Sequence, residues 1–343
     1  MFIQCTASLR KKLGLKEEDL SQGEVYGKYP DTFRAWHANL VRYHGKQSII
    51  LMNDETRYGV LLYGLKAKDF KNLKQLIFLG IRTALEMEGV RLEVIDTYLQ
   101  EDWGMTFGKT KDRKRVARMN RTAEEMYVYD RALEEDRIIQ KKISRATNRI
   151  ITGTGLYPYE MMLKNLHYFD PYKKKSVVET PLCHLRIQME LEGHEIYRRV
   201  AVPGLFSFRH LHEIIRIAFD WKDSHHHLFE IDHGDGRPIQ IVVYDDPETL
   251  FSFNEGTHEL LIDDRTYLQE MFHRFSKVKY TNDFGDRWVH SIQLEKITMT
   301  EQLEAEYLGG NGERPPENIG GELGFQRPLN SDELKMKIRR VYL

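Results

Sequence analysis

The second half of the chain contains the stretch CHLRIQMELEGHEIYRRVAV, residues 183–202, whose apolar pattern predicts two strands. Apolar and polar residues alternate from Cys183 to Leu191, which is typical of a strand with one buried face. A second strand is predicted over Tyr197–Val202, because a proline and a glycine follow it directly and end the pattern. Two strands joined by a short turn predict the start of an antiparallel sheet.

One helix and several further strands follow in this half. The spacing of Phe208, Leu211 and Ile215 predicts an amphipathic helix, with Ser207 as its N-cap. Strands are predicted over residues 228–231, 239–244, 277–280 and 288–294, a loop over 309–324 and a short last helix over 332–340. The second half is therefore predicted to be α+β, with strands in the majority.

The first half is predicted to combine strands with helices. Alternation indicates the strands, and apolar spacings of three and four residues indicate the helices. The strands are expected at residues 33–43, 48–52, 57–65 and 105–107, and the helices at 70–85 and 91–99. Residues 112–149 are charged and free of glycine and proline, so they predict one long helix or two consecutive helices that join the two halves.

A domain boundary is expected near Asp170–Lys175, because this stretch is polar and contains Pro171. The prediction is an N-terminal α+β domain of unknown function over residues 1–150, a linker over 151–181 and a C-terminal α+β domain over 182–343. Each domain is expected to hold a mostly antiparallel sheet with packed helices, and a long charged helical region is expected to join them. The length of 343 residues fits two domains, since one domain usually takes about 100–200 residues.

The composition narrows the class of protein. The 51 Lys and Arg residues nearly balance the 52 Asp and Glu residues, and the formal net charge is -1. A net charge so close to zero does not hold nucleic acid or an anionic membrane, so such a contact needs a local basic patch. The two cysteines, Cys5 and Cys183, exclude a disulfide scaffold and a cysteine-only zinc site. No signal-peptide pattern occurs and no apolar run approaches the ~20 residues of a membrane span, so a cytoplasmic protein is expected.

Four segments in the second half follow a known order of motifs. They are YRRVAVP at 197–203, LHEII at 211–215 with FDWKDSHHHLF at 219–229, YTNDFGDRWVH at 280–290, and PPENIGG at 315–321. Together they resemble the plasmid pRiA4b ORF-3-like family over about residues 180–328. The family pattern is W-R-R, L-H, G-W-x-x-S-H-x-H-x-F, Y-D-F-G-D-x-W-x-H and P-P-E-D-x-G-G.

The chain departs from this family pattern at four positions. Tyr197 stands where the family has tryptophan and Asp220 where it has glycine. Asn282 replaces a tyrosine and Asn318 an aspartate, and the last exchange removes a carboxylate from its loop. The resemblance implies a bacterial protein associated with a plasmid or another mobile element. The first half resembles a bacterial domain of unknown function at residues 36–40, 62–66 and 110–113.

Histidines and carboxylates recur in these motifs. His225 and His227 lie two apart at the start of a strand, so their rings would point to one face. Asp283 and Asp286 lie on either side of a Phe-Gly pair in an expected turn, and His290 ends the next segment. These ligand types suit zinc, manganese or iron, and such a divalent metal would activate water for hydrolysis. In the alternative interpretation the aspartates cap a turn and the histidines bind backbone carbonyls.

One dense basic run occurs between residues 109 and 121. On a helix its basic side chains would fall on one face, where they would contact the phosphates of a nucleic acid. The residues on that face are Lys111, Lys114, Arg115, Arg118 and Arg121. Acidic residues follow at positions 124, 125 and 134–136, and they favour the alternative of an ordinary solvated helix.

Two functions follow from these observations. The first is an uncharacterised bacterial protein that acts as a binding or accessory protein of a plasmid or mobile element. The second is a metal-dependent hydrolase or nuclease, with Asp283, Asp286, His290 and Glu317 as candidate catalytic residues. Nucleic acid is the partner that the basic run suggests, and a divalent metal is the cofactor that the histidines suggest. The chain contains no P-loop, dinucleotide-binding loop or Gly-x-Ser-x-Gly motif.

Overall fold

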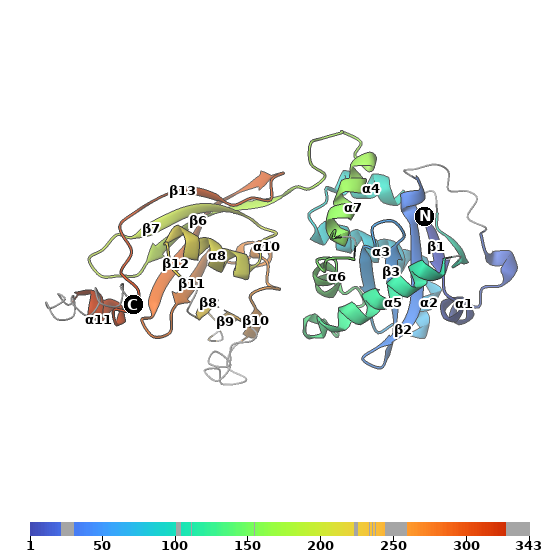
Figure 1. Ribbon diagram of the computed structural model, residues 1–343, viewed down its shortest axis with the longest axis horizontal. Helices are drawn as coiled ribbons and strands as arrows, with labels where there is room; N and C mark the ends of the chain where they lie inside the picture. The colour runs from blue at the N-terminus through green and yellow to red at the C-terminus, as the bar shows by residue number, and fades with distance from the viewer. Residues whose placement is uncertain are drawn as a thin grey trace. The chain divides into compact units, whose positions relative to one another are not determined.

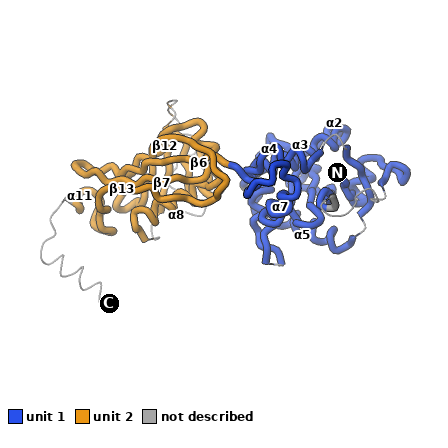
Figure 2. Tube along the Cα trace, turned by 90° about the horizontal axis from the view of Figure 1, so that it is seen from above, with its two compact units in different colours: residues 1–179 blue, residues 180–343 orange. Residues whose placement is uncertain are grey.

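The computed structural model divides the chain into two compact units, Met1–Glu179 and Thr180–Leu343 (Figure 2). The residues it describes are 1–21, 31–100, 104–110, 112–153, 155–222, 226–232, 234, 236, 238–243 and 259–326. The division after Glu179 lies close to the boundary expected from the sequence. The structure differs from the expected linker over 151–181, because this segment contains helix α7, Pro158–Leu166, as part of the first unit. Met162 and Leu166 of that helix are buried.

The first unit is built on a five-stranded sheet with the strand order β4-β3-β2-β1-β5 (Figure 1). β2, β3 and β4 form an antiparallel meander, whereas β1 lies parallel to both β2 and β5. The sequence pattern did not predict β1, because a four-residue strand that is buried at every position shows no alternation. The strands are β1 Phe2–Cys5, β2 Ala35–Tyr43, β3 Lys46–Asn53, β4 Gly59–Leu62 and β5 Thr106–Lys109.

Helices cover both faces of this sheet (Figure 1). Met119 and Met126 of α5 share a buried cluster with Met52 of β3 on one face. On the other face Gly80 of α3 lies so close to Leu62 of β4 that a Cβ there would meet its side chain at 2.8 Å. The α-helices are α1 Ala7–Leu13, α2 Ala67–Lys71, α3 Leu73–Met87, α4 Leu92–Leu99, α5 Arg113–Tyr127, α6 Lys141–Thr147 and α7. The short 3-10 helices are η1 Glu17–Asp19, η2 Asp31–Arg34, η4 Asp130–Ala132 and η5 His167–Phe169.

The charged region over residues 112–149 forms two helices, α5 and α6. Two consecutive helices were one of the two arrangements expected from the sequence. Both helices pack within the first unit, where Ile143 of α6 is buried and Ser144 Oγ accepts a hydrogen bond from the Leu61 backbone N–H at 3.1 Å. The region therefore does not join the two units, which corrects the sequence-based expectation. Its apolar residues serve the core of the first unit instead.

The second unit is built on an eight-stranded sheet with the order β10-β9-β8-β11-β12-β6-β7-β13. Its pairings are antiparallel apart from β9 with β10, so the predicted mostly antiparallel sheets in two domains are confirmed. The strands are β6 Thr180–Met189, β7 Tyr197–Pro203, β8 His227–Ile231, β9 Ile239–Val242, β10 Glu259–Ile262, β11 Lys277–Asn282, β12 Trp288–Thr300 and β13 Glu306–Asn311.

Helix α8, Phe208–Ala218, packs on this sheet through Phe208, Leu211 and Ile215, as its apolar spacing predicted. Two shorter helices are α10, Leu268–Phe272, and α11, Gly321–Gln326. The expected loop over 309–324 begins within β13 and ends within α11. The last helix expected at 332–340 lies outside the described residues.

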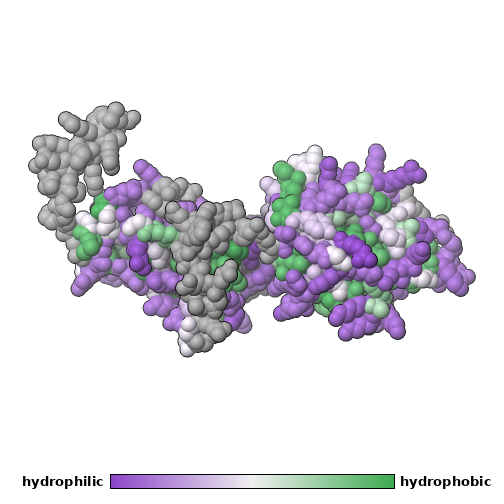
Figure 3. Space-filling view, turned by 90° about the horizontal axis from the view of Figure 1, so that it is seen from below, coloured by the Kyte–Doolittle hydropathy of each residue, from purple (hydrophilic) through white to green (hydrophobic). Residues whose placement is uncertain are grey.

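The described surface is largely hydrophilic on the face shown in Figure 3, where hydrophobic side chains occur in small groups between polar ones. Exposed hydrophobic side chains of the second unit include Ile217 and Tyr307. Among the helices that the structure describes, none is long and apolar enough to cross a membrane.

Candidate functional site

A buried hydrogen bond links His227 to Asp263, in the turn after β10 of the second unit. His227, at the start of β8, donates from Nε2 to Asp263 Oδ2 at 3.0 Å. Arg209 of α8 donates two hydrogen bonds, of 2.7 and 3.1 Å, to the same carboxylate. Burial alone would raise the pKa of Asp263, but the hydrogen bonds from His227 and Arg209 lower it below its usual value. Asp263 is therefore held as a carboxylate inside the unit.

A second histidine stacks on His227. The rings of His212 and His227 lie 3.7 Å apart between centroids and 11° from parallel. His212 Nδ1 hydrogen-bonds the Tyr280 hydroxyl at 2.8 Å, and that hydroxyl donates to Asn282 Oδ1 at 3.2 Å. Burial, and then the neighbouring His227, lower the pKa of His212 to about 3. His212 is therefore neutral at physiological pH.

His290 lies in an aromatic pocket on the same sheet. Its ring makes edge contacts with Phe219 and Trp221, at centroid distances of 5.0 and 5.1 Å, and lies 5.4 Å from the Tyr280 ring. The residue is fully buried, and burial lowers its pKa to about 3. Like His212, it packs as a neutral side chain.

The predicted acidic residues bind backbone amides instead. Asp283 Oδ1 accepts hydrogen bonds from the backbone N–H groups of Gly285 at 2.8 Å and Asp286 at 3.3 Å. Asp286 accepts from the N–H groups of Ile319 and Gly320, each at 3.1 Å. In the same way Glu317 Oε1 accepts from the Lys222 N–H at 2.6 Å. These carboxylates hold the turn after β11 and the loop before α11 in place, as the alternative interpretation proposed for the aspartates.

The structure brings part of the predicted cluster together. Strand β11 lies between β8 and β12, so Asn282 pairs with His227 and Tyr280 pairs with His290. His225 lies outside the described residues. Among the residues that the structure does describe, no three His, Cys, Asp or Glu side chains are placed to hold a metal ion. The metal site and its catalytic residues stay a prediction.

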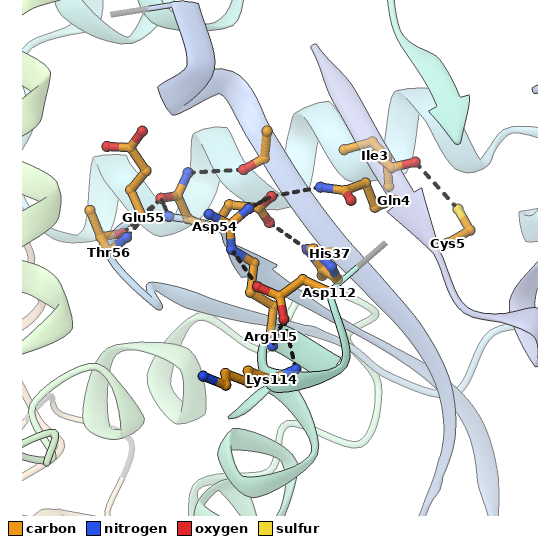
Figure 4. Close-up of polar contacts among 12 residues, drawn as sticks. Ile3, Gln4, Cys5, His37, Asp54, Glu55, Thr56, Asp112, Lys114 and Arg115 are labelled. Atoms are coloured by element: carbon orange, nitrogen blue, oxygen red, sulfur yellow. Dashed lines mark hydrogen bonds and ion pairs between the residues drawn. The ribbon is translucent and has the colours of Figure 1, made fainter. Parts of the chain in front are cut away.

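A buried polar cluster in the first unit was not predicted from the sequence (Figure 4). His37 of β2 is fully buried, and its Nδ1 lies 2.5 Å from Asp54 Oδ1. Gln4 of β1, which pairs with His37 across the sheet, donates to Asp54 Oδ2 at 2.6 Å. Arg115 of α5 donates to the same oxygen at 2.9 Å. The one signal in the sequence was polar residues inside strands that are otherwise apolar.

The basic side chains of the predicted run do not form one exposed helix face. Arg115 reaches inward to Asp54 (Figure 4), and Lys109 ends β5, where it pairs with Glu17 at 2.6 Å. The helix itself begins at Arg113, after the N-cap Asp112. Lys111 lies outside the described residues, whereas Lys114, Arg118 and Arg121 are exposed on α5.

Arg118 and Arg121 meet a third arginine at a cavity of about 340 Å³, here named the arginine cavity. The third is Arg57, in the turn between β3 and β4. Asn53 shapes this turn, because its Oδ1 accepts from the backbone N–H groups of Glu55 and Thr56 at 3.1 Å each. Arg57 adopts a left-handed backbone with φ of 61°, which is uncommon outside glycine. The cavity is lined by Arg57, Arg118, Arg121, Thr122, Glu125, Thr147, Asn148, Ile150, Ile151, Thr152, Gly153 and Pro158.

Two charged groups that line the arginine cavity, Arg57 and Glu125, have shifted pKa values. Burial, followed by repulsion from Arg118, lowers the pKa of Arg57. Burial raises the pKa of Glu125, although Arg121 and Arg57 act in the opposite direction. No described residue forms an ion pair with Arg57, Arg118 or Arg121. The basic run indicated Arg118 and Arg121, but Arg57 lies 61 positions before Arg118, and nothing in the sequence places it beside them.

Comparison with known proteins gives each unit a family. Residues 2–162 match a domain of unknown function, DUF6933, and residues 181–333 match the plasmid pRiA4b ORF-3-like proteins. The uncharacterized protein y4hQ of Sinorhizobium fredii (strain NBRC 101917 / NGR234) is 33% identical over 149 residues, which cover 41% of this chain and 69% of that protein. A solved structure of a protein of unknown function from Methanosarcina mazei Go1 is 28% identical, with a TM-score of 0.37, over 43% of this chain and 78% of that one. The resemblance read from the motifs is thus confirmed: the chain belongs to the plasmid pRiA4b ORF-3-like protein family through residues 181–333 and carries a DUF6933 domain before them.

Proposed function

We propose that this chain is a nucleic-acid-binding accessory protein whose first unit holds phosphate groups in the arginine cavity. The observation that carries the proposal is the convergence of Arg57, Arg118 and Arg121 on one cavity, with no ion-pair partner among the described residues. Guanidinium groups that face one another repel, and a phosphate bound between them would relieve that repulsion. Arginine suits this task because its planar fork donates two parallel hydrogen bonds to phosphate oxygens.

The surroundings of the cavity extend this basic surface. Arg113 and Lys114 are exposed on the first turn of α5, the helix that also carries Arg118 and Arg121. The hydrogen bond from Arg115 to Asp54 ties this helix to the sheet and so fixes where its exposed basic residues lie. A phosphate chain that follows α5 would therefore meet several cations. This local charge supplies what the net charge of -1 does not.

The family of the second unit supports the biological setting. Its description refers to a plasmid open reading frame, and a plasmid-encoded accessory protein would meet nucleic acid in the bacterial cytoplasm. The second unit would then serve as a scaffold or recognition module beside the phosphate-binding unit. Two of its histidines, His212 and His290, are buried and neutral, which suits a structural role in that scaffold.

The experiment is a titration of a fluorescent single-stranded oligonucleotide with the full-length chain at several salt concentrations. The test variant is R118Q/R121Q, and the matched control is K68Q/K71Q, which removes the same charge from the exposed Lys68 and Lys71 of α2. Each phosphate contact that is lost should reduce the slope of log K against log salt by about 0.7. We expect the test variant to lose about 1.4 in slope and the control to keep the wild-type slope.

Two results would overturn the proposal. The first is the absence of binding at low salt, where phosphate contacts are strongest. The second is an equal loss of affinity in R118Q/R121Q and K68Q/K71Q, which would show that net charge matters and the cavity does not.

A further inference from the structure

The arginine cavity has a basic side and an apolar side in its lining, and this difference bears on which ligand it binds. The arginines come from the β3–β4 turn and from α5, whereas Ile150 and Ile151 come from the segment between α6 and α7 and Pro158 from the first turn of α7. Ile151 is 56% exposed, so this apolar side is open to a ligand. A bare phosphate would use the arginines and leave the apolar side without a partner. A ligand with one anionic end and one flat apolar body would use both.

The size of the cavity accommodates one nucleotide. Its volume of about 340 Å³ lies at the lower end of the roughly 300–1,000 Å³ that small-molecule sites usually span. A mononucleotide has the required form, with a phosphate at one end and a planar base at the other. In this arrangement the phosphate lies against the arginines and the base packs on Ile150, Ile151 and Pro158.

Glu125 adds a specific polar group to the same lining. It projects from α5 one turn after Arg121, and it lies in the cavity without an ion pair to any of the three arginines. A carboxylate repels phosphate, so its partner in the ligand must be a hydrogen-bond donor. Among the four RNA bases, only guanine carries two adjacent donors, N1–H and N2–H, on its Watson–Crick edge. A carboxylate accepts both at once through its two oxygens.

We infer that the arginine cavity takes one unpaired guanine nucleotide, with its phosphate on the arginines and its Watson–Crick edge donating to Glu125. The inference rests on the proposed function and names the ligand of the same site. The nucleotide must be unpaired, because base pairing occupies the edge that Glu125 would read. The source is either a free nucleotide or a single-stranded segment, since both present the same chemistry.

The experiment measures the affinity of the full-length chain for GMP, AMP, CMP, UMP and inorganic pyrophosphate by calorimetry. We expect GMP to bind at least about tenfold more tightly than AMP, which corresponds to about 1.4 kcal/mol. The variant E125Q should bring the GMP-to-AMP ratio close to one, because an amide offers one acceptor oxygen. The matched control E124Q removes the same charge from the exposed Glu124 on the same helix and should keep the ratio.

The outcomes separate this inference from the proposed function. Equal binding of all four nucleotides and pyrophosphate, with no change of the ratio in E125Q, would overturn the guanine inference and leave phosphate binding intact. No binding of any phosphate compound, including a long oligonucleotide, would overturn both. A titration with oligonucleotides that carry one guanine at the end, one in the middle or none distinguishes the source. Tighter binding of either guanine-containing strand than of GMP assigns the site to nucleic acid, and equal binding assigns it to the free nucleotide.

Discussion

Acid should destabilise the second unit through its two neutral histidines. His212 and His290 are buried, and burial lowers the pKa of each from the usual 6.5 to about 3. In the unfolded chain both regain ordinary pKa values. Between pH 6.5 and 3 the unfolded chain therefore binds protons that the folded unit does not bind. The free energy of unfolding thus rises with pH across this window and decreases as the pH falls.

The magnitude follows from the number of protons. Each histidine that is protonated only in the unfolded state contributes a slope of about 1.4 kcal/mol per pH unit. Two such histidines give about 2.7 kcal/mol per pH unit, or about 4 kcal/mol between pH 5.5 and 4. That loss is a large part of the roughly 5–15 kcal/mol by which native domains are stable.

The assay is urea unfolding of the full-length chain at pH 6.5, 5.5 and 4.5, followed by tryptophan fluorescence. Trp221 and Trp288 report on the second unit, and both are buried there. The variant H290F should halve the pH slope, whereas H194Q at the exposed His194 should leave it unchanged. If H290F does not fold, an NMR titration of the wild-type histidines replaces it. A His212 or His290 signal that titrates near pH 6.5 in the folded protein would refute the reasoning, as would an H290F slope equal to that of the wild type.

Three further predictions concern single side chains. D54N should lower the free energy of unfolding of the first unit by about 3 kcal/mol, because it strips a buried carboxylate from Arg115 and His37; a change below about 0.5 kcal/mol in thermal unfolding would contradict it. Cys5 and Cys183 should resist iodoacetamide at pH 8 in the folded chain, since burial raises their pKa values to about 12 and about 11; rapid modification seen by mass spectrometry would count against this. D286A should release the loop around Ile319 and Gly320 and speed its cleavage in limited proteolysis, whereas unchanged cleavage would show that those two hydrogen bonds do not hold the loop.

The strands of the second unit could be predicted because each carries its own pattern. Cys183, Leu185 and Ile187 alternate with polar residues, and all three are buried in β6. Strand β1 could not be predicted, because its four residues depend on β2 and β5, which lie about 30 and 100 residues further along the chain. Likewise, the charge of residues 112–149 indicates helices but not where they pack. Their apolar residues, such as Met119 and Ile143, decide that by tertiary contact.

The residues of the candidate sites could likewise be predicted only in part. The sequence pattern put His227 and His290 in two separate predicted strands, and the pairing of β11 with both β8 and β12 placed both histidines beside Tyr280. The partner of His227 could not be predicted, because Asp263 lies 36 residues away after a different strand. Arg57 could not be predicted as a site residue for a similar reason, since a lone arginine in a turn carries no pattern. Packing of α5 on the sheet is what makes it the third member of the arginine cavity.

Direct binding of a labelled single-stranded oligonucleotide to the full-length chain tests the central claim. The claim predicts retention at low salt, a steep loss of affinity as salt rises, and a salt slope about 1.4 lower in R118Q/R121Q than in the wild type or in K68Q/K71Q. Binding that is absent at low salt, or a slope that is identical in all three proteins, would contradict it.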